Sequence, residues 1–495
     1  MKITMAEAMV RSLQAAGADC AFGVPGGYTS SLLDALDRSG MRTVRGMHEG
    51  GAAFMSAGYT QASGKLGVTF GQSGPGITNL VTGVAAAFMD SVPMVVIASA
   101  APVGEYAKDG HQESRGIGLM LDQLEMFRTM ARQLYRPPNP LAALRSLRQA
   151  VSLAVAERTT TVIDLGVDLA NAQLEMTDLE GRNFVARSEA IDVDAVEQVA
   201  ELIRTAKLPV LLIGDKIAHR GATLDLLKLC EHDIAVVCAD FAKGVIPEDH
   251  PMFAGVLGQS GHESAAEIVR EADVVIALGA RLSVQTTVGF EEGLFKRLIQ
   301  VDEEASEIAR HYAVDLGVVS NLPRFVRALA QRLTEPADRG MRAKIAALRT
   351  KHAVYGEDIT RRDEMNTPTA LRVLRERLPR EALICGDCGL NLQYLKKHFP
   401  IYAPDGFFNL YGLAAMGAAI PVSLGVKLAR PDEPVVAVIG DGGMMVYPGE
   451  LAVAAELGLN TITVVMNNRG YLQVGDRLQN YSARATPAPC PWSTS

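Results

Sequence analysis

The chain has 495 residues, a length that predicts about three domains. Hydrophobic residues make up 48% and charged residues 21%, as in an ordinary folded protein, and the formal net charge of −8 argues against nucleic acid as a partner. No apolar run reaches the roughly 20 residues that cross a bilayer, and the start reads as an amphipathic helix without a signal-peptide core. We therefore expect a cytoplasmic protein.

Short β-branched runs alternate with helical stretches along the chain, the pattern of parallel α/β sheets. Predicted strands in the first third are MRTVRGMH, LGVTFGQS, PMVVIAS and TTTVIDLG, and those in the middle are PVLLIGD, IAVVCAD, ADVVIALGA and RLIQVD. The last third offers EALICGD, PVVAVIG and TITVVM. The predicted fold class is α/β, with three tandem doubly wound parallel-sheet domains at 1–180, 190–335 and 365–482 and an irregular tail at 483–495.

The stretch VVAVIGDGGMMVYPGELAVAAELGLNTITVVMNN reads as strand, glycine-rich turn, helix and strand. In such a unit both strands end at one edge of the sheet, so we expect Asp441 and Asn468 to be neighbours. A carboxylate and an amide oxygen suit Mg²⁺, which fills its octahedron with phosphate oxygens and water. Gly440, Gly442 and Gly443 let the backbone approach a diphosphate, although a lone GDG is more often a simple turn.

GDG followed at this distance by NN resembles the signature of thiamine-diphosphate enzymes. The resemblance implies Asp441, Asn468 and the carbonyl of Gly470 as Mg²⁺ ligands. It implies diphosphate contacts from GDCGLN and cofactor contacts from YGLAAMG, where Met416 would bend the cofactor and the carbonyl of Ala414 would accept a hydrogen bond. The implied diphosphate-loop residues are Gly389, Leu390 and Asn391.

The first third carries an independent set of matches: FGVPGG, HEGGAAFMSAGYTQASGK and SGPGITN. Glu49 resembles the glutamate that hydrogen-bonds the cofactor's pyrimidine ring. Gly27 would approach the reacting centre through its backbone, and Gln112 in DGHQES matches a glutamine that acetolactate synthases place near the substrate. A surface-loop role for Gln112 stays an equal alternative, and His48 and His111 are each either proton carriers or hydrogen-bonded packing residues.

The chain is most similar to acetolactate synthase (acetohydroxyacid synthase) large subunits, through ASGK, SGPGITN, PMVV and KGVIPEDHP. The resemblance implies a transferase that decarboxylates a pyruvate-like 2-oxo acid and ligates the product to a second carbonyl compound. It also implies a homodimer or a dimer of dimers, with active sites between subunits. FAD is an open alternative that no residue supports, and Tyr28 stands where the synthases have a small residue.

Two alternatives remain: a decarboxylase or lyase of another 2-oxo acid or 2-hydroxy ketone, and a truncated, non-catalytic paralogue. The second arises because the resemblance stops soon after NNRGYLQVGDRLQNY, which leaves open whether activity is impaired. The donor and acceptor substrates and any regulatory subunit are not determined by the sequence.

Overall fold

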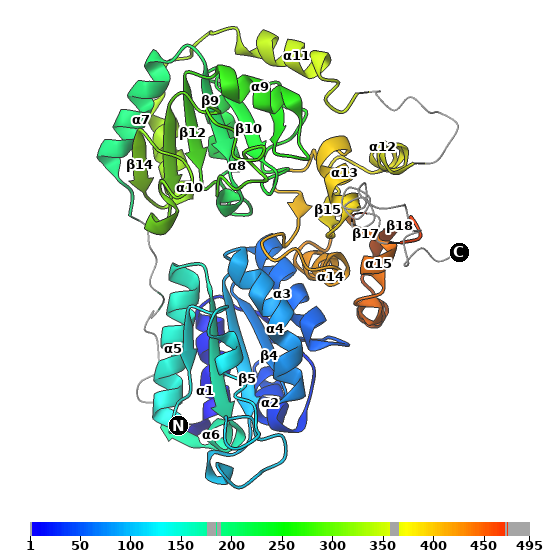
Figure 1. Ribbon diagram of the computed structural model, residues 1–495. Coiled ribbons are helices and arrows are strands. Elements are labelled where there is room, and N and C mark those ends of the chain that lie inside the picture. The colour runs from blue at the N-terminus through cyan, green and yellow to red at the C-terminus, as the bar shows by residue number, and fades with distance from the viewer. Residues whose placement is uncertain (1, 176–184, 186–189, 357–365, 471–472, 474–495) are drawn as a thin grey trace, which may run out of the picture. The chain divides into compact units, whose positions relative to one another are not determined.

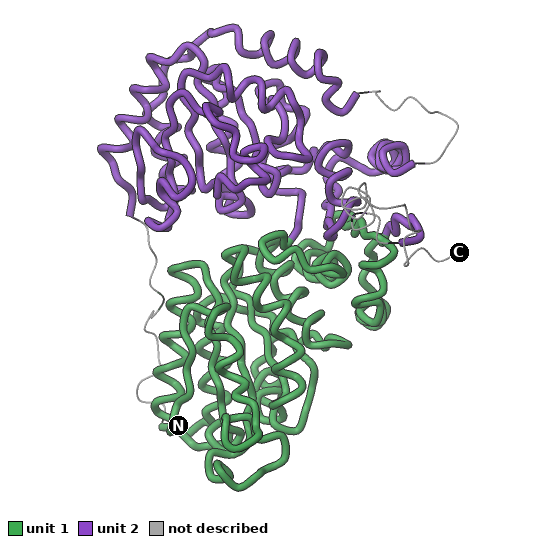
Figure 2. The backbone as a smooth tube through the Cα atoms, in the orientation of Figure 1, with its two compact units in different colours: residues 1–188, 410–463 green, residues 189–409, 464–495 purple. Residues whose placement is uncertain are grey.

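A computed structural model of the protein describes residues 2–175, 185, 190–356, 366–470 and 473. They belong to two compact units, one of residues 1–188 and 410–463 and the other of residues 189–409 and 464–495 (Figure 2). None of the helices in the described ranges combines the length and hydropathy that a bilayer-spanning helix requires. The predicted tail at 483–495 lies outside the described residues.

The first unit is built on a six-stranded sheet in which every neighbouring pair is parallel (Figure 1). Its spatial order is β3 (Arg42–Arg45), β2 (Cys20–Gly23), β4 (Gly67–Gly71), β5 (Met94–Ala100), β7 (Thr160–Gly166) and β6 (Gln133–Tyr135). The four strands predicted in the first third are confirmed as β3, β4, β5 and β7. A separate antiparallel pair joins β1 (Lys2–Thr4) to β8 (Gln173–Glu175).

Helices cover both faces of this sheet. α1 (Met5–Ala15), α2 (Ser30–Arg38) and α5 (Pro140–Ala156) share one apolar core with the sheet. The other face carries α3 (Glu49–Ser63) and α4 (Pro75–Met89), which pack against each other and against β4. α6 (Val167–Asn171) follows β7.

A helix from the last third of the chain packs on α3 within the same unit. This helix, α14 (Ala419–Ala429), approaches α3 through glycine: a Cβ on Gly58 would lie 2.4 Å from the Val422 carbonyl oxygen, and one on Gly425 would lie 2.0 Å from the Met55 carbonyl oxygen. Backbones this close exclude any side chain at either glycine. β17 (Val435–Gly440), α15 (Asp441–Met444) and α16 (Leu451–Leu457) follow in the same unit.

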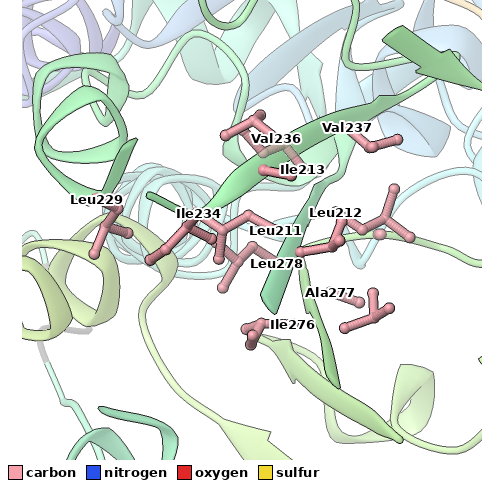
Figure 3. Close-up of a cluster of buried hydrophobic side chains, with 14 of the residues drawn as sticks. Leu211, Leu212, Ile213, Leu229, Ile234, Val236, Val237, Ile276, Ala277 and Leu278 are labelled. Atoms are coloured by element: carbon pink, nitrogen blue, oxygen red, sulfur yellow. The ribbon is translucent and has the colours of Figure 1, made fainter. Parts of the chain in front are cut away.

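The second unit contains another six-stranded parallel sheet, in the order β11 (Phe253–Leu257), β10 (Ala235–Ala239), β9 (Pro209–Ile213), β12 (Val274–Leu278), β13 (Leu298–Asp302) and β14 (Leu316–Val319). Buried aliphatic side chains from neighbouring strands, among them Leu211, Val236 and Ile276, form its core (Figure 3). The helices are α7 (Val193–Thr205), α8 (Thr223–Cys230), α9 (Glu263–Glu271), α10 (Leu322–Arg332) and α11 (Met341–Lys351).

The same unit carries α12 (Thr367–Arg377), α13 (Leu390–His398) and the parallel pair β15 (Leu383–Gly386) and β16 (Phe407–Phe408). The chain passes between the two units within β18 (Thr461–Met466). The parallel sheets with helices on their faces confirm the predicted α/β class.

Candidate active site

The first sheet has a topological switch point between β2 and β4. The chain runs from β2 to β3 toward one edge, and from β4 through β5 toward the other. Ligands of open α/β sheets bind outside the carboxyl ends of the strands at such a point. Three candidate site positions follow these strand ends: Gly26–Tyr28 after β2, Glu49 after β3 and Gln72 after β4. Gly27 and Glu49 were predicted from the sequence, and Gln72 was not.

Glu49 is the first residue of α3, and its side chain is buried within the unit, with 9% of the residue exposed. Its Oε2 accepts a hydrogen bond of 2.9 Å from Nδ2 of Asn79, a residue of α4. No hydrogen bond to Oε1 is found among the described residues. A Cβ built on Gly76 would lie 3.0 Å from Oε1, so this oxygen faces the glycine-rich start of α4. Asn79 thus fixes one oxygen of the buried carboxyl group, and the other oxygen lies against the start of α4.

His48 is the N-cap of α3. Its Nδ1 accepts a hydrogen bond of 3.0 Å from the Gly50 backbone N–H, and its ring meets that of Tyr447 edge to face at 5.5 Å. Because Nδ1 is used in capping, His48 has the geometry of a hydrogen-bonded packing residue.

Gly27 and Gln112 lie on two loops that meet. Gly27 begins a short 3₁₀ turn, Gly27–Thr29, and a Cβ there would meet nothing within 4 Å, so its surroundings are open. Gln112 lies on the loop after β5 with φ +55°, in the left-handed region that few side chains adopt. Its Oε1 accepts a hydrogen bond of 2.7 Å from Nε2 of Gln72. Gln112 is therefore an integral member of the cluster at the strand ends.

The loop after β17 reaches the start of α3 through Glu450. The two carboxylate oxygens of this buried residue accept hydrogen bonds of 3.1 Å from the Met47 backbone N–H and 2.9 Å from the His48 backbone N–H. Burial raises the pKa of Glu450 above its ordinary value, the two hydrogen bonds lower the pKa, and the nearby Glu49 raises it. Glu450 thus holds the backbone immediately before Glu49.

The GDGG segment forms one helical turn directly after β17, at the place of the predicted glycine-rich turn. Gly440 ends β17, Asp441 begins α15, and the Gly442 backbone N–H donates a hydrogen bond of 3.0 Å to Asp441 Oδ1. Ala414 adopts φ +55°, and Met416 is half-buried. A Cβ on Gly417 would lie 3.1 Å from the Gly443 carbonyl oxygen, so the YGLAAMG turn lies against the GDGG turn.

The remaining predicted residues belong to the second unit. Gly389 has φ +111° and precedes α13, whose first two residues are Leu390 and Asn391, and Asn391 Nδ2 donates to the Asp387 carbonyl oxygen at 3.2 Å. Asn468 and Gly470 follow β18. Because Asp441 belongs to the first unit, its juxtaposition with Asn468 stays a prediction.

Comparison with known proteins gives three consecutive family matches. Residues 3–126 match the family model of the thiamine pyrophosphate enzyme, N-terminal TPP binding domain. Residues 196–329 match the model of the central domain, and residues 387–491 match that of the C-terminal TPP binding domain. This chain belongs to the thiamine pyrophosphate enzyme family. The third match passes the predicted end of the last domain at residue 482, and the predicted domain boundaries remain predictions.

Relatives of this thiamine pyrophosphate enzyme carry two different names. The probable acetolactate synthase large subunit of Methanococcus aeolicus is 29% identical over 94% of this chain and 80% of its own length. The acetolactate synthase large subunit of Corynebacterium glutamicum is 30% identical over 94% of this chain and 75% of its own length. The sulfoacetaldehyde acetyltransferase of Rhodobacter capsulatus is 28% identical over 94% of this chain and 82% of its own length. The protein is thus a thiamine-diphosphate enzyme similar to acetolactate synthases, and the matches lend FAD no support.

Three residues of this site escaped the sequence reasoning: Gln72, Asn79 and Glu450. The signal for Gln72 was its position directly after a buried strand, the same signal that singled out Glu49. Asn79 lies inside the SGPGITN match, and Glu450 lies nine positions after Asp441 at the start of the next helix. The hydrogen bonds that bind these residues into the site join positions 30 to 403 apart in the chain, where local sequence patterns carry no information.

Proposed function

We propose that the protein decarboxylates a pyruvate-like 2-oxo acid and ligates the product to a second carbonyl acceptor, as an acetolactate synthase does. The observation that carries this proposal is the buried Glu49 carboxyl group at the switch point, beside the paired amides of Gln72 and Gln112. Thiamine diphosphate, when bound, supplies a nucleophilic carbon that adds to the oxo group and allows carbon dioxide to leave. The residues of this chain bind, orient and exchange protons.

Glu49 has the features that a proton partner of the cofactor's pyrimidine ring needs. Asn79 orients the carboxyl group through one oxygen, and the other oxygen is left for a ring nitrogen. The fixed N-cap of α3 and the hydrogen bonds from Met47 and His48 to Glu450 hold this carboxyl group in place. Gly27 would add its open backbone edge next to the reacting carbon.

The metal part of the proposal assigns Mg²⁺ to Asp441, Asn468 and the carbonyl oxygen of Gly470. Oxygen donors of this kind suit Mg²⁺, and one or two protein carboxylate or amide ligands are the usual number beside a diphosphate. Gly440, Gly442 and Gly443 would let the diphosphate approach the start of α15, and Gly389, Leu390 and Asn391 would bind it from the start of α13. Ala414 and Met416 would contact the rest of the cofactor.

The test is Glu49→Gln. We expect it to abolish carbon dioxide release from pyruvate while magnesium-dependent binding of thiamine diphosphate, measured by calorimetric titration, stays largely intact. The amide retains the size of the side chain but cannot supply the proton. Wild-type-like rates in this variant would remove Glu49 from the mechanism. Product analysis then separates the alternatives, because pyruvate alone gives acetolactate only by ligation.

Similarity to a sulfoacetaldehyde acetyltransferase gives a second candidate. If the protein consumes sulfoacetaldehyde and produces no acetolactate from pyruvate, this second candidate replaces the first. A decarboxylase or lyase would release an aldehyde and form no ligated product.

We also propose a homodimer or dimer of dimers in which each site uses two chains. Co-expression of Glu49→Gln with Asp441→Ala tests this arrangement. If Glu49 and Asp441 of one site come from different chains, each mixed dimer keeps one intact site, and random pairing restores about a quarter of wild-type activity. If both residues of a site come from one chain, the mixed preparation stays inactive.

A further inference from the structure

Gln72 follows β4 at the switch point and connects three loops of the site. Its Oε1 accepts a hydrogen bond of 2.8 Å from the Tyr28 backbone N–H, on the loop after β2. Its Nε2 donates to Oε1 of Gln112, on the loop after β5, at 2.7 Å. One side chain therefore ties the loop Gly26–Tyr28 (the glycine loop) to the loop after β5 that carries Gln112 (the substrate loop), across the carboxyl edge of the sheet.

These two hydrogen bonds fix the orientation of both amides. A backbone N–H can only donate, so the Gln72 atom facing Tyr28 must be the carbonyl oxygen Oε1. The other end of the same amide is then an NH₂ group, and the Gln112 atom that it meets must be an acceptor. Gln112 consequently turns its Oε1 inward, and its NH₂ group is the end that remains for a ligand.

The backbone of Gln112 is equally constrained. Its φ of +55° is held by its own carbonyl oxygen, which accepts hydrogen bonds of 2.7 Å from Ser73 Oγ and 3.1 Å from Ser114 Oγ. The preceding residue is fixed as well, because Tyr28 Oη donates to the His111 carbonyl oxygen at 2.8 Å. The Gln112 backbone is thus held in a costly conformation by several partners, so its side chain starts from a fixed position.

Gln72 also lies close to the carboxyl group of Glu49. A Cβ built on Gly76 would lie 3.0 Å from Glu49 Oε1 and 3.1 Å from Gln72 Cβ. A Cβ on Gly26 would lie 2.4 Å from Gln72 Oε1, so the glycine loop can approach only because residue 26 lacks a side chain. Gln72 thus stands between Glu49 and the amide of Gln112.

We propose that Gln72 is a positioning residue that sets the amide of Gln112 to donate hydrogen bonds to an oxygen of the carbonyl substrate. Substrates that offer an acceptor oxygen at this place, carboxylate or carbonyl, are selected over those that offer a donor. This inference rests on the proposed function, since it assumes that the site takes a 2-oxo acid. Beyond the proposed function, the inference says that Gln72, a residue outside the loop of Gln112, determines which substrates the Gln112 amide can bind.

Two substitutions of Gln72 make opposite predictions for a positioning role and a merely structural role. Gln72→Glu keeps the hydrogen bond from Tyr28, but its second oxygen forces the Gln112 amide to turn round and present Oε1 to the substrate. Gln72→Met loses both hydrogen bonds and leaves Gln112 free to take either orientation. A positioning role makes Glu the worse replacement, whereas a structural role makes Met the worse one.

The experiment measures KM and kcat for pyruvate together with the dissociation constant of the pyruvate analogue oxamate, by calorimetry on protein loaded with thiamine diphosphate and Mg²⁺. We expect Gln72→Glu to raise KM and the oxamate constant about tenfold, an effect typical of one misplaced hydrogen bond. Gln72→Met should raise them about two- to threefold, with a smaller change in kcat than in KM for both. Gln133→Glu, an exposed glutamine on β6, is the matched control.

The outcomes separate this inference from the proposed function. If the wild type releases no carbon dioxide from any 2-oxo acid, the proposed function fails, while the oxamate constants still rank the variants. If Met is the worse replacement, if both variants bind oxamate as the wild type does, or if the wild type does not bind oxamate, the positioning role is overturned. Melting temperatures identify a variant that fails to fold, and the other variant then decides by comparison with the wild type.

Discussion

The contact between Glu450 and the start of α3 predicts a coupling that can be measured as a free energy. A Cβ built on Gly51 would lie 2.1 Å from Glu450 Oε1, closer than any real contact. In Gly51→Ala the carboxylate must therefore move away and give up its hydrogen bonds from Met47 and His48. When Gly51→Ala is combined with Glu450→Ala, the methyl group added at position 51 enters the space that the carboxylate occupied.

The size of the effect follows from the hydrogen bonds involved. Each hydrogen bond to a charged group contributes about 1.5–3 kcal/mol. The raised pKa of Glu450, which comes chiefly from burial, shows that ionisation here is penalised, so we use the lower end. Alanine is favoured over glycine in a helix by about 0.5–1 kcal/mol. Gly51→Ala should then cost about 2 kcal/mol in the wild type and stabilise slightly when Glu450 is already alanine.

Urea denaturation of the four proteins of this double-mutant cycle, followed by circular dichroism, gives the coupling energy. The expected value is about 2 kcal/mol or more, far above the additivity error of distant sites. Gly104→Ala is the matched control, because a Cβ there meets nothing within 4 Å, and its cost should be the same in both backgrounds. An equal cost of Gly51→Ala in the two backgrounds would show that Glu450 does not lie against α3.

Two further predictions concern the second unit. Lys243 and Glu248 form a fully buried ion pair at 2.7 Å, so Lys243→Met should lower the free energy of unfolding by about 3–5 kcal/mol in the same denaturation assay. Adding Glu248→Leu should recover only part of this loss, because the Tyr355 hydroxyl and the Ile401 backbone N–H then lose their acceptor. Burial lowers the pKa of His262 to about 3, the nearby Lys243 charge lowers it further, and the hydrogen bond to the Lys397 carbonyl oxygen opposes this shift. The native ring is therefore neutral, with Nδ1 accepting from the Val256 N–H and Nε2 donating to the Lys397 carbonyl oxygen. The unfolded chain binds this proton from about pH 6.5 downward while the native state does not, so stability should fall between about pH 6.5 and 3 by about 5 kcal/mol. His262→Gln should flatten that pH dependence in thermal melts, and an unchanged acid transition would contradict the assignment.

The sequence predicted most strands inside the sheets and the edge strand β3, but it missed the short interior strand β2 and several strands at the edges. β5, β9, β12 and β17 are almost continuous apolar runs, because parallel strands covered on both faces contain few polar residues. β6, β14 and β16 have two to four residues each, too few for a periodic signal. The pairing of β1 with β8 joins the first residues of the chain to residues 173–175, which no local pattern can indicate.

In the candidate site too, residues marked by local patterns were predicted and residues brought in by long-range contacts were not. Residues marked by a motif, such as Glu49 and Asp441, could be named because a strand end and a glycine-rich turn are local features. Their partners could not, since the hydrogen bonds of Gln72 and Glu450 depend on which loops meet after folding. The packing of α14 on α3 likewise depends on two glycines more than 360 positions apart.

Tyr28 illustrates how a departure in sequence changes meaning once its contacts are known. A bulky residue beside the glycine loop suggests a narrower substrate pocket, but its backbone N–H and its hydroxyl group are both used to hold loops, at Gln72 and at the His111 carbonyl oxygen. Burial raises the pKa of Tyr28 above its ordinary value, so the hydroxyl stays protonated and remains a donor at neutral pH. A small residue at this position would keep the N–H that orients Gln72 and lose only the anchor of the substrate loop. If Gln112 contacts the substrate as proposed, the tyrosine would act on selectivity through the placement of residues 111 and 112, in addition to any volume that its ring occupies.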